Sequence, residues 1–218
     1  MPKQHPTSNW SQAATILAGR DPVVRRLVEQ TGPPDLQTST ETHFEALVRA
    51  VVYQQLAGRA AAAIHGRLIA VLSDTVTPGK LLSLPVEELR AAGLSGRKVA
   101  SLQDLSAKVL DGTIVLDPAG LLEIGDEDLI ARLSTVLGIG RWTAEMFMLF
   151  QLQRMDVWPA GDLGVRKGYG LAWELPIPTV KELEPLGEPF RPYRSVLAWY
   201  CWRAAELYGG AGKSALTR

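Results

Sequence analysis

The chain of 218 residues has little of what several classes of protein require. Its one cysteine, Cys201, excludes an internal disulfide framework, a four-cysteine iron–sulfur cluster and a cysteine-based zinc site. The three histidines, His5, His43 and His65, lack the spacing of metal ligands. No apolar core follows the N-terminus and no run of about 18 apolar residues exists, so neither a secretory signal nor a membrane span is expected. These absences predict a reducing, cytosolic location.

The chain also lacks an excess of charge of either sign. Its 23 basic and 23 acidic residues give a formal net charge of +0, which argues against binding nucleic acid by overall charge. The distribution is uneven, however. Residues 191–218 contain five basic residues and one acidic residue, whereas residues 117–128 contain five acidic and no basic ones. A neutral total can therefore conceal a basic face.

Apolar residues recur at intervals of three and four along nearly the whole chain, which predicts nine or ten helices and an all-α fold. A Ser/Thr cap at Ser39–Thr40 opens one helix, and a break at Ala57–Gly58 precedes the next, which runs to Leu72. Further helices are expected at residues 85–93, 96–112, 126–136, 141–152, 162–173 and 192–210. The segment GTIVLDP at 112–118 is strand-like, but one short run does not make a sheet.

Two glycines interrupt the segment LSTVLGIGRWTAEMF at residues 133–147. Gly138 and Gly140 permit a partner to approach the backbone without a Cβ in the way. The helix that follows begins with unsatisfied N–H groups and the positive end of its dipole, which together favour an anion such as phosphate. Such a site needs little net charge. The alternative is a glycine cap and a tight turn between two helices.

Asp162 follows Pro-Ala-Gly and precedes a helical run, which is the position of an N-cap. One interpretation ends there, because aspartate is a preferred cap. The other places a carboxylate at a helix start, facing a cleft beside the anion site. The local sequence leaves both interpretations open.

The segment LSTVLGIGRWTAEMFMLFQLQRMDVWPAGDLGVRKG, residues 133–168, resembles the helix–hairpin–helix plus Gly/Pro/Asp signature of the base-excision DNA glycosylases. Residues 51–64, 93–106 and 192–203 are most similar to the 3-methyladenine DNA glycosylase II branch. The resemblance covers about residues 41–205. It implies an all-α, two-lobed fold with the active site in the cleft between the lobes. One lobe, a helical barrel of residues 41–150, would end in the helix–hairpin–helix, whose hairpin is residues 137–140. The other, residues 1–40 plus 151–218, would carry the catalytic aspartate.

The resemblance also implies roles for individual residues. Asp162 takes the place of the catalytic aspartate, and the amides of Leu137 to Gly140 would hold a phosphate of the damaged strand. Leu56 would fill the gap left by the extruded base, with Gln55 as its polar companion; the alternative for Leu56 is a place in the core. No cofactor is required, but Na⁺ or K⁺ would sit beside the hairpin on the main-chain carbonyls of three residues: Ser134, Val136 and Ile139.

Several side chains are candidates for the base pocket and for contacts to DNA. Trp142 would present its face to a cationic base, or else anchor the hairpin on the core. Further pocket candidates are Tyr53, Met146 and Trp158. Trp199 and Trp202 are expected in the core. The remaining DNA-contact candidates are Ile139 in the hairpin, Arg141, Thr143, Arg166, Lys167 and Arg194, although surface arginines are usually just solvated.

Bifunctional relatives carry a lysine two residues after the second hairpin glycine, where this chain has Trp142. An indole cannot form a Schiff base with the sugar. The sequence therefore predicts a monofunctional hydrolase that removes alkylated bases, 3-methyladenine and related N-alkylpurines, from duplex DNA after base flipping. The alternatives are a helix–hairpin–helix DNA-binding module without catalysis and a glycosylase for another lesion. We expect a monomer, in the bacterial cytosol or nucleoid rather than a eukaryotic nucleus.

Overall fold

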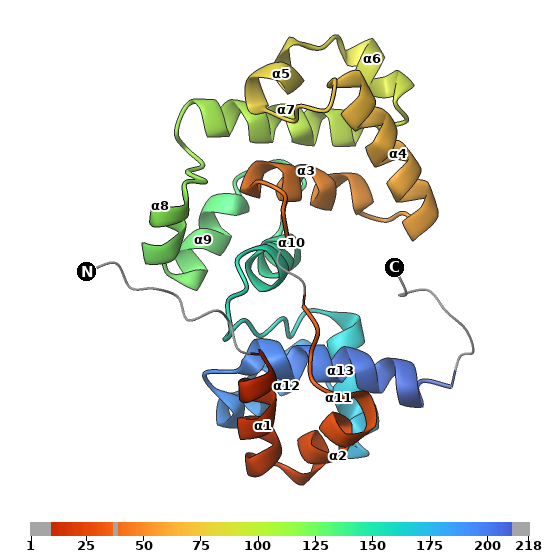
Figure 1. The fold of residues 1–218 in the computed structure, drawn as a ribbon, viewed down its shortest axis with the longest axis vertical. Helices are drawn as coiled ribbons and strands as arrows, with labels where there is room; N and C mark the ends of the chain where they lie inside the picture. Colours follow the sequence, from red (N-terminus) through yellow and green to blue (C-terminus); the bar gives the residue numbers. More distant parts are fainter. Residues whose placement is uncertain (1–9, 37–38, 211–218) are drawn as a thin grey trace. The chain divides into compact units, whose positions relative to one another are not determined.

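The computed structural model describes residues 10–36 and 39–210, and no β-strand occurs in them. The expectation of an all-α chain is confirmed for these residues. The chain divides into two compact units (Figure 1). We call Ser39–Phe147 the hairpin unit, and Met1–Thr38 with Met148–Arg218 the aspartate unit. The divisions expected from the sequence, at residues 41 and 150, lie two and three residues later. No helix among the described residues has both the length and the apolar character needed to cross a membrane.

The hairpin unit is built around α7, which packs against α3, α5 and α6 (Figure 1). Its helices are α3 His43–Tyr53, α4 Gly58–Val71, α5 Pro78–Ser83, α6 Val86–Ala91, α7 Gly96–Leu110, α8 Pro118–Glu123, α9 Asp126–Leu133 and α10 Arg141–Met146. The expected cap at Ser39–Thr40 is wrong. Thr42 caps α3 instead, because its hydroxyl accepts the Glu45 N–H while the Glu45 carboxylate accepts the Thr42 N–H.

Two other segments of this unit differ from the expectation. The strand-like residues 112–118 form a connection, in which Ile114 is buried and its N–H donates to the Lys108 carbonyl at 2.8 Å. The apolar run therefore reflects one buried side chain in a loop. The helix after Gly140 changes its winding at Phe147 and continues as the π-helical turn η1, Phe147–Gln151. The chain passes from the hairpin unit into the aspartate unit within this turn.

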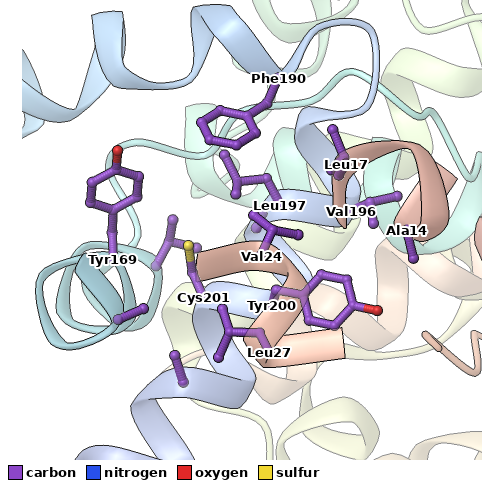
Figure 2. Close-up of a cluster of buried hydrophobic side chains, with 14 of the residues drawn as sticks. Ala14, Leu17, Val24, Leu27, Tyr169, Phe190, Val196, Leu197, Tyr200 and Cys201 are labelled. Carbon is purple, nitrogen blue, oxygen red and sulfur yellow. The ribbon is translucent and has the colours of Figure 1, made fainter. Parts of the chain in front are cut away.

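The aspartate unit is organised by its last helix. Its elements are α1 Trp10–Arg20, α2 Pro22–Thr31, α11 Leu163–Trp173, α12 Val180–Leu186, the 3₁₀ turn η2 Glu188–Phe190 and α13 Arg194–Tyr208. The two N-terminal helices were not expected from sequence. Figure 2 shows Tyr200 and Leu197 of α13 among Leu17 of α1 and Leu27 of α2. Each side chain of this kind contributes about 1.5–3 kcal/mol when fully buried, so the unit has a substantial core of its own.

Helices α11 and α13 touch backbone to backbone. A Cβ added at Gly168 of α11 would lie 1.7 Å from the Cys201 carbonyl oxygen of α13, which no side chain tolerates. Glycine therefore allows the two helices to approach this closely. Because the contact fixes α11 on α13, it also fixes the start of α11, where Asp162 stands.

Candidate functional site

The predicted hairpin joins α9 to α10. The Ile139 N–H donates to the Val136 carbonyl at 3.0 Å and closes the turn. Gly138 has φ +81°, and a Cβ there would lie 2.6 Å from the Ser101 hydroxyl oxygen. Gly140 has φ −107° and open space where a Cβ would be. The fold thus requires glycine at position 138. At position 140 a side chain would contact no other part of the protein, but it would contact a molecule bound there.

The hairpin N–H groups are not equivalent. The Leu137 N–H donates to the Asp104 carboxylate at 2.7 Å, and the Ile139 N–H is taken by Val136. The N–H groups of Gly138, Gly140 and Arg141 have no hydrogen-bond partner among the described residues. Of the amides of residues 137–140, only those of the two glycines are therefore available to a phosphate. The Arg141 amide, which follows them, is available as well.

Asp162 caps α11, as its position in the sequence predicts. Its Oδ1 accepts the Val165 N–H at 2.8 Å and the Trp202 indole N–H at 2.9 Å. The cap does not exclude a chemical role, because the same two bonds fix the orientation of a half-buried carboxylate. Burial and the nearby Asp162 carboxylate raise the pKa of the Cys201 thiol, which leaves that thiol inert.

Trp202 packs against the core of the aspartate unit, as expected, and is in addition a partner of Asp162. Its ring stacks on Phe150 of η1, with centroids 5.6 Å apart and planes 21° apart. Phe150, Trp202 and Asp162 thus form a connected constellation in the aspartate unit. The sequence could not indicate it, because residues 40 apart are brought together by the crossing of α11 and α13.

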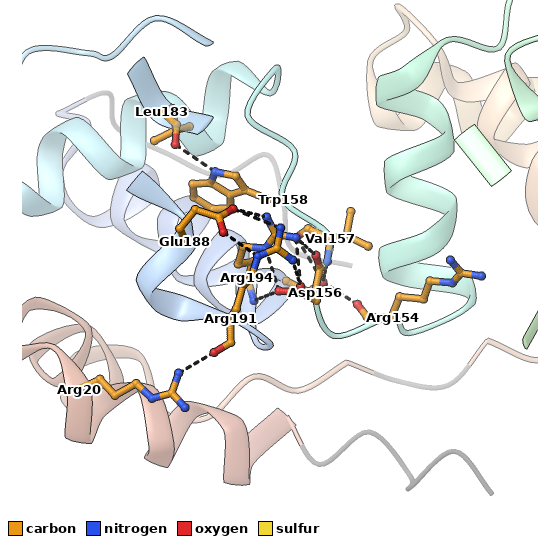
Figure 3. Close-up of polar contacts among 10 residues, drawn as sticks. Arg20, Arg154, Asp156, Val157, Trp158, Leu183, Glu188, Arg191 and Arg194 are labelled. Atoms are coloured by element: carbon orange, nitrogen blue, oxygen red, sulfur yellow. Dashed lines mark hydrogen bonds and ion pairs between the residues drawn. The ribbon is translucent and has the colours of Figure 1, made fainter. Parts of the chain in front are cut away.

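The segment before Asp162 is fastened to the start of α13 (Figure 3). The Ser195 hydroxyl donates to the Arg154 carbonyl at 2.5 Å and accepts the Val157 N–H at 2.9 Å. The Asp156 carboxylate accepts from Arg194 Nε at 2.8 Å and from Arg191 Nη1 at 2.5 Å. Arg194 is only 12% exposed within this network. The side chain expected to contact phosphate thus anchors the loop that leads to Asp162.

The four base-pocket candidates differ in their surroundings. Trp142 is 48% exposed, so it is not a buried anchor of the hairpin. Tyr53 and Met146 are half-buried, and the Tyr53 ring packs edge-on to His65, with centroids 5.9 Å apart. Trp158 belongs to the other unit, where its indole N–H donates to the Leu183 carbonyl at 3.1 Å. Since it packs against Gly187 as well, Trp158 fits the core better than a pocket.

Gln55 and Leu56 lie at the exposed tip between α3 and α4. Gln55 has φ +56°, which is uncommon for a residue with a side chain. Leu56 is 38% exposed, so its alternative as a core leucine is wrong. Gln54, which the sequence did not single out, bonds this loop to the hairpin, since its Nε2 donates to the Gly138 carbonyl at 3.0 Å.

Three of the predicted DNA contacts have other partners. Thr143 is buried, and its hydroxyl accepts from Gln54 Nε2 at 3.3 Å, so this side chain already has a partner within the hairpin unit. The Arg141 guanidinium pairs with both oxygens of Glu127, at 2.5 and 3.0 Å. Arg166 donates to the Pro178 carbonyl at 3.4 Å. Lys167 is exposed on α11 and remains a candidate.

The hairpin also offers the three carbonyls predicted to hold a monovalent cation, those of Ser134, Val136 and Ile139. The Val136 carbonyl accepts one hydrogen bond, from the Ile139 N–H, and a carbonyl oxygen has two lone pairs. Neutral oxygen donors fit Na⁺ or K⁺. Within residues 10–36 and 39–210, no three His, Cys, Asp or Glu side chains gather closely enough to hold a metal ion.

Comparison with known proteins places these features in a family. Residues 48–192 match the HhH-GPD superfamily of base excision DNA repair proteins. "DNA-3-methyladenine glycosylase 1" of Schizosaccharomyces pombe is 35% identical over 210 residues, which cover 94% of this chain and 92% of that protein. "DNA-3-methyladenine glycosylase 2" of Escherichia coli is 26% identical over 169 residues, 73% of this chain and 56% of that protein. Relatives thus occur in a yeast as well as in a bacterium, which gives no support to the expected bacterial location.

Two solved structures share the fold. The S. pombe 3-methyladenine DNA glycosylase in complex with abasic DNA superimposes with a TM-score of 0.79 at 35% identity, covering 92% of this chain and 100% of that one. A DNA-3-methyladenine glycosidase of Bacillus halodurans gives 0.82 at 32% identity, with 90% of each chain covered. With its hairpin, its capping aspartate and these matches, the chain belongs to the HhH-GPD superfamily of base excision DNA repair proteins.

Proposed function

We propose that this protein is a monofunctional DNA glycosylase. It flips an alkylated base, 3-methyladenine or a related N-alkylpurine, out of duplex DNA and hydrolyses its N-glycosidic bond. The observation that carries the proposal is the Asp162 carboxylate, held by the Val165 and Trp202 N–H groups at the start of α11. The names of the relatives, DNA-3-methyladenine glycosylases among them, support the same substrate class.

Binding begins at the hairpin. The N–H groups of Gly138, Gly140 and Arg141 point to a phosphate of the damaged strand, and the start of α10 adds the positive end of a helix dipole. This mode of binding agrees with a formal net charge of +0, because main-chain amides replace salt bridges. Na⁺ or K⁺ on the carbonyls of Ser134, Val136 and Ile139 would add positive charge beside the same phosphate.

The damaged base must leave the stack before its glycosidic bond can be reached, which costs a few kcal/mol. Leu56, an exposed apolar residue at the tip of its loop, is suited to enter the gap and offset part of that cost. Gln55 beside it would face the opposite strand. The exposed ring of Trp142 would stack on the extruded base, where cation–π attraction favours a positively charged N-alkylpurine by about 0.5–2 kcal/mol.

The bond from C1′ of the sugar to the base nitrogen then breaks, and the electron pair leaves with the base. Because N3- or N7-alkylation gives the base a positive charge, it departs neutral and needs no general acid. The sugar becomes oxocarbenium-like, and the Asp162 carboxylate stabilises this cation. Water adds to C1′ while Asp162 orients it and accepts its proton. The product is an abasic site.

The absence of strand cleavage is part of the proposal. Trp142 occupies the place two residues after Gly140 where a lysine would be needed for a Schiff base with the sugar. Without an amine at this place, water is the nucleophile and the strand remains intact at the abasic site.

The test is a chromatographic profile of the bases that the protein releases from methylated duplex DNA. We expect 3-methyladenine or another N-alkylpurine to be released. Binding to duplex without release of any base would identify a non-catalytic binding module. Release confined to further duplexes that carry uracil, an oxidised purine or a mismatched base would instead identify a glycosylase for another lesion.

A further inference from the structure

Helix α7 carries a polar stripe on one face: Lys98, Ser101, Asp104 and Lys108. Their spacing of three and four residues places these side chains along one side of the helix. Each of them contacts a segment of the hairpin unit that the proposed function uses. The stripe therefore has two groups of contacts, one to the end of α3 and one to the hairpin.

Lys98 holds the end of α3. Its ammonium donates to the carbonyl of Val52 at 2.6 Å and to that of Gln54 at 2.9 Å. Carbonyls in the last turn of a helix lack partners within the helix, and a cation there also meets the negative end of the dipole. The chain enters the Gln55–Leu56 tip directly after these two carbonyls, so Lys98 fixes where the tip begins.

The other members of the stripe hold the hairpin. Ser101 lies against Gly138, leaving no room for a Cβ there. Asp104 Oδ2 accepts the Leu137 N–H at 2.7 Å. Lys108 donates to the same carboxylate at 2.8 Å and to the Thr135 carbonyl at 2.5 Å. The turn between α9 and α10 is thus attached to α7 on both sides of Val136.

Gln54 joins the two groups directly. Its Nε2 donates to the Gly138 carbonyl at 3.0 Å and to the Thr143 hydroxyl at 3.3 Å. The main-chain carbonyl of Gln54 accepts a hydrogen bond from the Lys98 ammonium. The residue next to it, Gln55, adopts φ +56°, a conformation that persists only where the surroundings impose it. The tip and the hairpin are therefore parts of one bonded assembly.

We propose that Gln54 and Lys98 are positioning residues that hold the Leu56 tip at a fixed spacing from the phosphate-binding amides of Gly138 and Gly140. The inference rests on the proposed function. Opening a base stack is unfavourable, and a mobile tip would retract from it. A tip bonded to the hairpin cannot retract while the hairpin holds a phosphate, so the phosphate contact drives the insertion of Leu56.

The test uses Gln54→Leu and Lys98→Met, with Lys98→Arg as the conservative variant and the exposed Lys181→Met as a control for loss of charge. Single-turnover excision is measured on two duplexes that carry the same N-alkylpurine, either normally paired or opposite an abasic site. Extrusion is easier in the second duplex, because the lesion has no pairing partner. The melting temperature of each variant serves as the check on folding.

We expect Gln54→Leu and Lys98→Met to lower the excision rate about tenfold or more on the paired duplex. On the duplex with the abasic site opposite the lesion, the rate should fall less than about threefold. Lys98→Arg should recover the paired rate, and Lys181→Met should match wild type. Equal losses on the two duplexes, or no loss on either, would overturn the proposal.

A wild type that excises from neither duplex would instead disprove the proposed function. In that case, the insertion of Leu56 into DNA is measured by the fluorescence of 2-aminopurine placed beside an abasic analogue. A rise in fluorescence with wild type but not with Gln54→Leu or Lys98→Met supports the positioning role. Equal rises with all three proteins refute it.

Discussion

At the scale of single residues, Asp162 is both a helix cap and the proposed reactive group. Its place after Pro-Ala-Gly allowed the cap to be predicted, because aspartate at a helix start follows from local chemistry. Its partner Trp202 was not predicted, since the indole reaches Asp162 from 40 positions away. The ion pair of Arg194 was not predicted for a similar reason. Its partner Asp156 lies 38 positions away, so the sequence does not distinguish this arginine from a solvated one on the surface.

The exposed Trp142 ring gives a prediction at this scale. Trp142→Ala should lower the free energy of unfolding by much less than the roughly 3–5 kcal/mol that a buried tryptophan contributes, because the side chain is 48% exposed. Excision of a cationic N-alkylpurine should fall by about tenfold, the order that a desolvated cation–π contact supplies. Chemical denaturation and single-turnover kinetics measure the two effects. A large loss of stability with unchanged kinetics would make Trp142 a structural anchor.

The two hairpin glycines predict opposite results. Gly138→Ala should destabilise the protein by about 1–3 kcal/mol, because residue 138 has φ +81° and lies against Ser101. Gly140→Ala should leave stability unchanged, since φ is −107° and the space is open, yet weaken binding to duplex DNA. Thermal melts and fluorescence anisotropy separate these outcomes. If Gly140→Ala binds duplex as wild type does, the amide of residue 140 is not a phosphate ligand.

At the scale of elements, the attachment of the hairpin to α7 predicts a dependence on pH. Burial alone would raise the pKa of Asp104, but hydrogen bonds from Lys108 and the Leu137 N–H outweigh it and lower that pKa. Because the folded pKa lies below the unfolded one, the stabilisation is complete above the unfolded value, about pH 4. It is lost as pH falls through the lower folded value.

The stability difference between wild type and Asp104→Asn should therefore shrink as the solution is acidified below about pH 4. Urea unfolding at a series of pH values measures this difference, and Asp128→Asn, at an exposed position of α9, is the matched control. A difference that does not vary with pH would show that the charge of Asp104 does not hold the hairpin.

The elements that the sequence predicted best are long, such as α7 and α13, with 15 residues each. Of the six-residue helices, α5 and α8 were not predicted, whereas α6 was, because Pro85 and Gly93 mark its two ends. The segment at 112–118 looks strand-like because three apolar residues follow one another, although only Ile114 among them is buried. The change of winding at Phe147, which lies where the chain passes from one unit to the other, was not predicted either.

At the scale of the whole molecule, the order and spacing of the hairpin and the aspartate in the sequence were enough to predict the family. The lobes of the fold were implied by that resemblance and not by composition. Contacts such as that of Gln54 with Gly138 could not be predicted from the sequence, because they join residues 84 positions apart.

The absence of a lysine after the hairpin predicts the chemistry of the whole protein on DNA. Treatment with borohydride during turnover should trap no covalent adduct, because Trp142 cannot form a Schiff base. Denaturing gel electrophoresis of labelled DNA measures this, with a glycosylase that also cleaves the strand as the positive control. A trapped protein–DNA band would contradict the monofunctional assignment.

The central claim concerns the charge of Asp162, and Asp162→Asn tests it most directly. Asparagine caps helices as well as aspartate does, so stability should change by less than about 1 kcal/mol. Excision of N-alkylpurines from methylated duplex DNA should nevertheless fall by about 100-fold or more, because the negative charge that stabilises the sugar cation is gone. We predict rapid release of base by wild type and nearly none by the folded variant. Full activity in Asp162→Asn would contradict the account.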